Sequence, residues 1–146
     1  MPQLTNGDAH DLLDAYKRAW ERRDVDSAME LYTDDAEHRD HPFRDPFIGS
    51  NAIRGMWNDI ARNERHVEFD AERVWISGST VLASWHGAYT DITNGDRVRM
   101  RGFMTLELDD ARRVRRLREW PVTRVVGRDS TLRLEAVGAA VDDRGR

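Results

Sequence analysis

The chain of 146 residues contains no cysteine, and this absence excludes disulfides, thiolate catalysis and cysteine-ligated metal sites. It also contains no apolar run near the roughly 20 residues that a membrane-spanning helix needs. The N-terminal segment, MPQLTNGDAH, has neither the basic flank nor the apolar stretch of a signal peptide. We therefore expect a cytoplasmic protein with no membrane partner.

Excess positive charge is absent as well. The formal net charge is −4, which disfavours a nucleic-acid partner. The arginines between Arg97 and Arg118 are diluted by Glu107, Asp109 and Asp110, so we interpret them as the outer face of a sheet. With 39% hydrophobic and 34% charged residues, the composition is typical of one globular domain with a real core.

Helical spacing dominates the first part of the chain. We expect a helix capped by Asp8 that ends near Arg23, and a second helix over 25–32 capped by Asp24 or Asp26. A third helix should be capped by Ser50 or Asn51. The predicted buried positions recur at helical spacing: Leu12, Leu13, Tyr16, Ala19, Trp20, Ala28, Met29, Leu31, Ile53, Met56, Trp57 and Ile60.

From Glu64 onward the apolar period changes to two, which is typical of strands. Residues 33–35 read as a turn and residues 36–41 as a first strand. Later strands are expected at about 67–76, 80–90, 97–108 and 114–122, with a hairpin turn at Asn94-Gly95-Asp96. Helices followed by antiparallel strands predict an α+β fold. The patterned domain spans residues 8–124, and residues 125–146 are expected to be a partly disordered extension.

The predicted first strand is unusually rich in ionisable groups. His38, Asp40 and His41 are costly to bury unless each is paired or used. His38 and Asp40 share one face of the strand, so both are candidates for a polar site. No strong third ligand accompanies them, and we expect no metal.

The order of these features carries a family resemblance. The segments RRDVDS (22–27), LYTDDAEHRDHPF (31–43) and GSNAIRGMW (49–57) resemble the SnoaL-like branch of the nuclear transport factor 2-like superfamily, over roughly Leu12 to Val122. The resemblance implies a cone-shaped, curved antiparallel sheet with three N-terminal helices that close a central pocket. Relatives include ketosteroid isomerases, polyketide cyclases, dehydratases, epoxide hydrolases and proteins that only bind or dimerise.

The resemblance also suggests site residues. Aligned from the first helix, Tyr16 falls on the oxyanion-hole tyrosine of ketosteroid isomerases and Asp40 on their general base. The third member of that site falls near Met104, which cannot donate a hydrogen bond, so steroid isomerisation itself is disfavoured. SnoaL-type cyclases use an acidic residue deep in the pocket, and the register of the phrase LREW (117–120) implies that Glu119 faces Asp40 there.

Aromatic and apolar residues complete the expected pocket. Gly87 and Gly102 remove side-chain bulk from the concave face and leave room for a ligand. The residues expected to bind it are Trp57, Trp85, Phe43, Phe47, Met104 and Leu117.

The leading hypothesis is a cofactor-independent enzyme that performs acid/base chemistry on a hydrophobic carbonyl compound, by isomerisation, cyclisation or dehydration. Asp40 would be the base, Tyr16 the oxyanion donor, and Glu119 or His38 the partner acid. The first alternative is a non-catalytic module that binds a hydrophobic ligand or dimerises. The second is an epoxide hydrolase-like enzyme, which needs an arginine near Asp40, with Arg39, Arg99 and Arg101 as candidates. A homodimer through the outer sheet face, around Phe103 and Trp120, is expected in any case.

Overall fold

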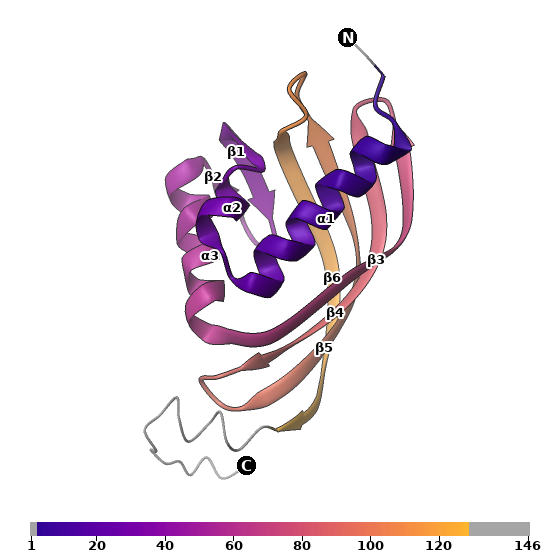
Figure 1. Ribbon diagram of the computed structural model, residues 1–146. Helices are drawn as coiled ribbons and strands as arrows, with labels where there is room; N and C mark the ends of the chain where they lie inside the picture. The colour runs from indigo at the N-terminus through magenta and orange to yellow at the C-terminus, as the bar shows by residue number, and fades with distance from the viewer. Residues whose placement is uncertain (1–2, 129–146) are drawn as a thin grey trace.

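The computed structural model describes residues 3–128, which form one curved six-stranded sheet and three helices (Figure 1). The strand order is β2-β1-β6-β5-β4-β3. All neighbouring strands are antiparallel except β1 and β6, which run parallel. The predicted α+β class and curved sheet are confirmed. The elements are α1 (Asn6–Arg22), α2 (Val25–Met29), β1 (Tyr32–Arg39), β2 (Phe47–Ile48), α3 (Ser50–Asn63), β3 (Glu64–Ser77), β4 (Thr80–Asp91), β5 (Asp96–Leu108) and β6 (Val114–Arg128).

The helix starts differ slightly from the prediction. Thr5, not Asp8, caps α1, and the two side chains form a capping box in which each accepts from the other's backbone amide. Asp24 caps α2 as expected. That helix ends at Met29 because Tyr32 already belongs to β1.

The first strand begins earlier than predicted. Residues 33–35 were expected to form a turn, but they lie within β1, which pairs with β6 from Tyr32 onward. The turn-favouring residues Asp34 and Asp35 point to solvent, and a register irregularity between Tyr32 and Glu37 accommodates them. β1 also ends earlier than predicted, at Arg39, so Asp40 and His41 lie in the loop after it.

The hairpins of the second half were predicted correctly. β3 and β4 join at Gly78-Ser79, and β4 and β5 join through Asn94-Gly95. The last strand runs on to Arg128, which pairs with Asp96, so it passes the predicted domain end at residue 124. The remainder of the predicted extension, 129–146, lies outside the described residues.

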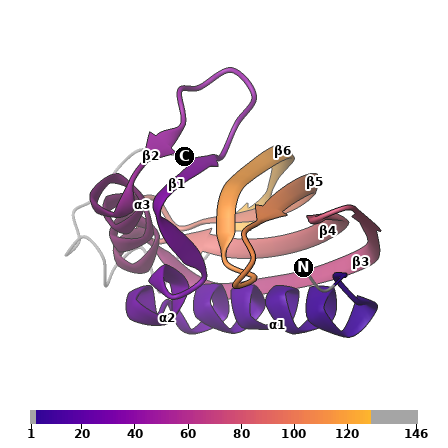
Figure 2. The same cartoon turned by 90° about the horizontal axis from the view of Figure 1, so that it is seen from above.

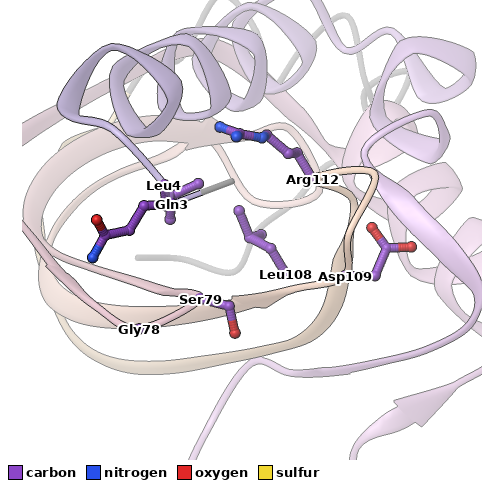
Figure 3. A pocket seen from close by; sticks show the side chains of 7 residues that line it. All are labelled: Gln3, Leu4, Gly78, Ser79, Leu108, Asp109 and Arg112. Atoms are coloured by element: carbon purple, nitrogen blue, oxygen red, sulfur yellow. The ribbon is translucent and has the colours of Figure 1, made fainter. Parts of the chain in front are cut away.

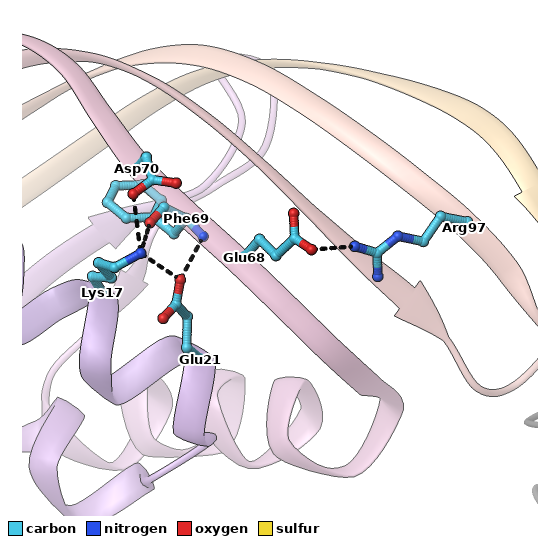
Figure 4. Close-up of polar contacts among 6 residues, drawn as sticks. All are labelled: Lys17, Glu21, Glu68, Phe69, Asp70 and Arg97. Carbon is cyan, nitrogen blue, oxygen red and sulfur yellow. Dashed lines mark hydrogen bonds and ion pairs between the residues drawn. The ribbon is translucent and has the colours of Figure 1, made fainter.

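The sheet bends over α1, and α3 stands beside β1 and β2 at one end (Figures 1 and 2). Lys17 forms hydrogen bonds between α1 and β3 (Figure 4). Its Nζ donates to Glu21 Oε2 at 2.7 Å, to the carbonyl oxygen of Phe69 at 2.7 Å and to Asp70 Oδ1 at 3.0 Å. Glu21 in turn accepts from the Phe69 amide at 2.9 Å. These polar contacts set the position of the helix over the concave face.

An aromatic cluster fills the space between α1 and the sheet. The ring centroid of Trp85 lies 5.5 Å from that of Phe69 and 6.2 Å from that of Trp20. A Cβ at Gly102 would stand 2.7 Å from Cζ2 of Trp85, and one at Gly87 would stand 2.7 Å from the carbonyl oxygen of Glu68. The two glycines were expected to make room for a ligand. They instead make room for the indole of Trp85 and for the close approach of β3.

Gly102→Ala is therefore expected to lower the free energy of unfolding by about 1–3 kcal/mol, because the fully buried indole has no free space to move into. Chemical denaturation monitored by fluorescence measures this change. Gly55→Ala is the matched control, since a Cβ there meets nothing within 4 Å on an exposed helix position. It should be neutral or slightly stabilising. Equal stability of the two variants would contradict the proposed packing role of Gly102.

Candidate functional site

A cavity of about 550 Å³ lies between α3, α1, the loop after β1 and the far ends of β4, β5 and β6. Its apolar wall consists of Tyr16, Trp20, Phe47, Met56, Trp57, Ile60, Tyr89 and Met100. Its carboxyl groups are those of Asp40, Asp59, Glu64, Asp91 and Glu119. The remaining polar side chains of the lining are those of His38, His41, Arg44, Asn63 and Thr123. The volume is that of a small-molecule site, and its wall is apolar in part and polar in part.

Glu119 is the most connected of these carboxyl groups. It projects from the inner face of β6 and is 8% exposed. Its Oε2 lies 2.8 Å from His38 Nε2 and accepts from the Tyr16 hydroxyl at 3.4 Å. His38 comes from β1, which runs parallel to β6, so the parallel pairing brings these two side chains together.

Two further side chains fix the orientation of the His38 ring. The Nε1–H of Trp57 donates to the Tyr32 hydroxyl at 3.1 Å, and that hydroxyl lies 2.8 Å from His38 Nδ1. Because an indole can only donate, the Tyr32 oxygen accepts from Trp57. A carboxylate oxygen can only accept, so the contact with a Glu119 carboxylate makes His38 Nε2 the donor. All of this chain is buried.

Tyr16 contributes a hydroxyl to the same wall. Its burial, together with the nearby carboxylate of Glu119, raises the pKa of Tyr16 well above its usual value. Tyr16 is therefore a proton-bearing donor at all ordinary pH values. Its 3.4 Å contact with Glu119 is long for an O–H···O bond.

Asp40 lines the cavity from its solvent side. Its side chain is 28% exposed and lies 3.7 Å from the guanidinium Nε of Arg44. Its Oδ1 atom is covered but accepts no hydrogen bond. Asp40 and Glu119 thus line one cavity, but only Glu119 is enclosed and oriented by donors.

Glu64 is a cavity residue that sequence reasoning missed. Burial, with the negative charges of Asp91 and Glu119, raises the pKa of Glu64 to about 7, against the opposing hydrogen bond from Trp20. The Trp20 Nε1–H donates to Glu64 Oε1 at 2.9 Å. The relevant sequence signal was Trp20, which was expected to be buried and therefore needs an acceptor for its indole N–H. Nothing in the sequence identified Glu64 as that acceptor.

The other residues expected to bind a ligand divide into two groups. Trp57 and Phe47 line the cavity. Trp85, Met104 and Leu117 are fully buried in the packed core and do not line it, because the aromatic cluster fills the space over them. Phe43 is 93% exposed in the loop between β1 and β2.

The three arginines considered for epoxide chemistry do not line the cavity. Arg101 pairs with Glu72, Arg39 donates to the backbone carbonyl oxygen of Arg44, and Arg99 is exposed. The arginine that does line the cavity is Arg44. Within residues 3–128, no group of three or more His, Asp or Glu side chains is arranged to hold a metal ion.

A smaller hollow of about 270 Å³ lies at the opposite end of the sheet, between the N-terminal segment and the β3–β4 and β5–β6 turns (Figure 3). It contains none of the predicted site residues. In the described part of the chain, no helix combines the length and apolar character required to cross a membrane.

The fold and cavity define a small α+β protein of the cone-shaped type. The SnoaL-like domain model matches residues 13–116, and the chain belongs to that family. This confirms the resemblance seen in the sequence. A search of curated protein sequences found no match.

Several solved structures share the fold. SalBIII, an epoxide hydrolase/cyclase-like enzyme with a role in pyran ring formation in the polyether salinomycin, is 19% identical, with a TM-score of 0.73 over 81% of this chain and 95% of its own. An LEH-like epoxide hydrolase from Mycobacterium tuberculosis is 18% identical, with a TM-score of 0.68 over 80% and 84%. A candidate SnoaL-like polyketide cyclase from Shewanella denitrificans is 16% identical, with a TM-score of 0.68 over 78% and 90%. At these identities the similarity establishes the fold alone.

The pKa of Glu64 predicts a pH dependence of stability. The folded protein keeps a proton on Glu64 up to about pH 7, whereas an unperturbed glutamate releases it near pH 4.5, so the folded state binds more protons in this window. The free energy of unfolding attributable to Glu64 should therefore fall as pH rises from 4.5 to 7, by up to about 3 kcal/mol.

Denaturation curves across this pH range for the wild type, Glu64→Gln and Glu30→Gln measure the contribution. Glu64→Gln should flatten the fall, and the exposed control Glu30→Gln should keep the wild-type slope. If Glu64→Gln leaves the slope unchanged, the buried, protonated state of Glu64 is wrong.

Proposed function

We propose that the protein transfers protons on a hydrophobic, carbonyl-bearing molecule without a cofactor, and that Glu119 is the group that carries the proton. The observation that supports this most is the 2.8 Å contact of Glu119 with His38 in the wall of the cavity. A carboxylate held by an oriented histidine, within reach of a ligand, has the arrangement of a general base and its partner.

In the proposed step, the Glu119 carboxylate removes a proton from the carbon beside the carbonyl. The C–H bonding electrons move into a new C=C bond and negative charge develops on the carbonyl oxygen. Tyr16 is the proposed donor to that oxygen, because its hydroxyl keeps its proton and its long bond to Glu119 is readily exchanged for a bond to the ligand. Return of the proton to another carbon gives isomerisation, whereas attack on a second carbonyl gives cyclisation.

Asp40 was expected from the sequence to be the base. We propose the reverse assignment of the two carboxylates, because Glu119 is enclosed and oriented whereas Asp40 is partly exposed and lies beside Arg44. The shared fold supports the reaction class, since solved structures similar to this chain include a candidate SnoaL-like polyketide cyclase and an epoxide hydrolase/cyclase-like enzyme.

The test is deuterium exchange into a panel of hydrophobic ketones, including 2-tetralone and 2-decalone, followed by proton NMR in D₂O. The wild type should accelerate loss of the α-proton signal. Glu119→Gln should lower the rate at least about 100-fold, the usual contribution of a general base. Asp40→Asn is the matched comparison and should retain most of the rate.

Unfolding curves of both variants control for loss of the fold. A Glu119→Gln protein that is folded and fully active would overturn the assignment. Loss in Asp40→Asn alone would restore the sequence-based assignment. Tight ketone binding without any exchange by the wild type would favour the non-catalytic binding module.

Water attack on an epoxide is a second candidate function. The observation that favours it is Arg44, which lines the cavity 3.7 Å from Asp40 and gives a carboxylate–arginine pair in the same site as Glu119. It predicts that styrene oxide yields a diol with one oxygen from H₂¹⁸O, and that Arg44→Gln lowers this rate at least about tenfold. Absence of diol from a panel of epoxides would exclude it.

We also propose that two copies pair through the sheet face that points away from α1. On this face the rings of Trp75, Phe103 and Trp120 form a row with centroid separations of 6.0 and 6.4 Å, and Trp75 and Trp120 are 44% and 41% exposed. Contiguous exposed aromatic surface marks an interaction site.

Sedimentation velocity tests the dimer. Wild-type protein should sediment as a dimer, and Trp120→Glu should shift it to a monomer because a carboxylate would be buried in the apolar contact. Arg18→Glu, on the exposed side of α1, is the control and should leave the dimer intact. A monomeric wild type at micromolar concentration would exclude the proposal.

A further inference from the structure

Glu64 is a cavity carboxyl group that the proposed reaction has not used. It is the first residue of β3, and its side chain lines the same cavity as Glu119 from a different strand. Its Oε1 already accepts a hydrogen bond from the Trp20 indole at 2.9 Å. If the carboxyl group is protonated, its second oxygen is the one that carries the proton and can donate it.

The surroundings of Glu64 disfavour a negative charge. Its direct cross-strand partner in the β3–β4 ladder is Asp91, and Tyr89, Tyr16 and Glu119 are the other titratable groups that act on it or feel its charge. Like charges directly opposite one another in a sheet repel. None of these neighbours is cationic.

The adjacent arginine does not neutralise the carboxyl group. Arg65 Nη1 donates to the backbone carbonyl oxygens of Ala61 at 3.0 Å and of Glu64 at 2.9 Å. Its guanidinium therefore satisfies backbone carbonyl oxygens at the end of α3 and does not line the cavity. A carboxyl group in an apolar wall, opposite another carboxylate, is held most readily as the neutral acid.

We propose that Glu64 is the second proton-transfer residue of the cavity, and that its carboxylic acid donates to the carbonyl oxygen of the ligand while Glu119 removes the α-proton. This inference rests on the proposed function and specifies it: the ligand is a neutral ketone or aldehyde whose oxygen faces Glu64. The pKa of about 7 is consistent with a proton that is held in the free protein and released during reaction.

The step is balanced without any co-reactant. The α C–H bond breaks and its proton passes to Glu119, the bonding electrons form the C=C bond, and the proton of Glu64 passes to the carbonyl oxygen to give an enol. Glu119 is then neutral and Glu64 anionic. The reverse transfers, with the carbon proton returned at the same or another carbon, restore both groups.

The first measurement is the infrared C=O stretch of 2-tetralone, with natural and ¹³C-labelled carbonyl, bound to the inactive Glu119→Gln protein. A hydrogen bond from Glu64 lowers this frequency. A second substitution in that protein, Glu64→Leu, removes this donor and should raise the frequency, although not as far as in an apolar solvent, because Tyr16 still donates to the carbonyl oxygen. The control substitution Glu30→Gln, at an exposed position that does not line the cavity, should leave the carbonyl frequency unchanged.

The second measurement is the pH profile of deuterium exchange with Glu119 intact. Glu64→Gln keeps a hydrogen-bond donor but has no proton to transfer, so kcat should fall at least about tenfold with little change in KM. The decline of kcat above about pH 7 in the wild type should also disappear. A residue that only supports the fold would not remove that decline.

The outcomes separate this inference from the proposed function. The same carbonyl frequency with and without Glu64→Leu, or wild-type kcat and pH profile in Glu64→Gln, would overturn the role of Glu64 and leave that of Glu119 standing. Failure of the wild type to bind or exchange any ketone would overturn both.

Discussion

The buried contact between His38 and Glu119 is the interaction on which the site depends. Burying two ionisable side chains is costly unless their hydrogen-bonding groups are satisfied, and here each has partners. The chain that begins at the Trp57 indole passes through Tyr32 and His38 and ends on Glu119. The residues of this hydrogen-bonded chain come from α3, β1 and β6. The Glu119 carboxylate is therefore oriented correctly only when these three elements are packed together.

Side chains fill the middle of the concave sheet face, whereas a cavity remains at the end of the sheet beside α3. Trp85, with the room that Gly102 provides, packs the middle of the concave face, so the cavity is displaced toward α3 and the ends of β4, β5 and β6. The cavity wall combines apolar and aromatic side chains with carboxyl groups that come from separate elements: strands, α3 and the loop after β1. Such a site can give neighbouring carboxyl groups different protonation states, which is what acid/base chemistry at one pH requires.

The sequence predicted most of the fold because its periodicity is clear. The helices at Tyr16 and Trp57, and the hairpins at Gly78 and Asn94-Gly95, follow from spacing and turn residues. The family resemblance pointed to Tyr16, Asp40 and Glu119, which line one cavity with His38. The start of β1 was missed because pairing with β6 overrides the turn preference of Asp34 and Asp35.

Other features were beyond sequence reasoning because they depend on tertiary contacts. The role of Tyr32 requires knowing that β1 runs from this residue alongside β6. Glu64 looks like an ordinary polar residue between a helix and a strand. Only the packing of Trp20 and the register opposite Asp91 place this half-buried acid in the cavity wall beside another carboxyl group. Alternation put Met104 and Leu117 on the inner face, but it did not show that the core beneath them is full.

The most direct test of the account is the tautomer of His38, measured by ¹⁵N NMR of histidine-labelled protein at neutral pH. The account predicts a proton on Nε2 that is donated to the Glu119 carboxylate. A neutral ring whose proton lies on Nδ1, which leaves Nε2 with no proton to donate, would contradict this contact and the role assigned to Glu119.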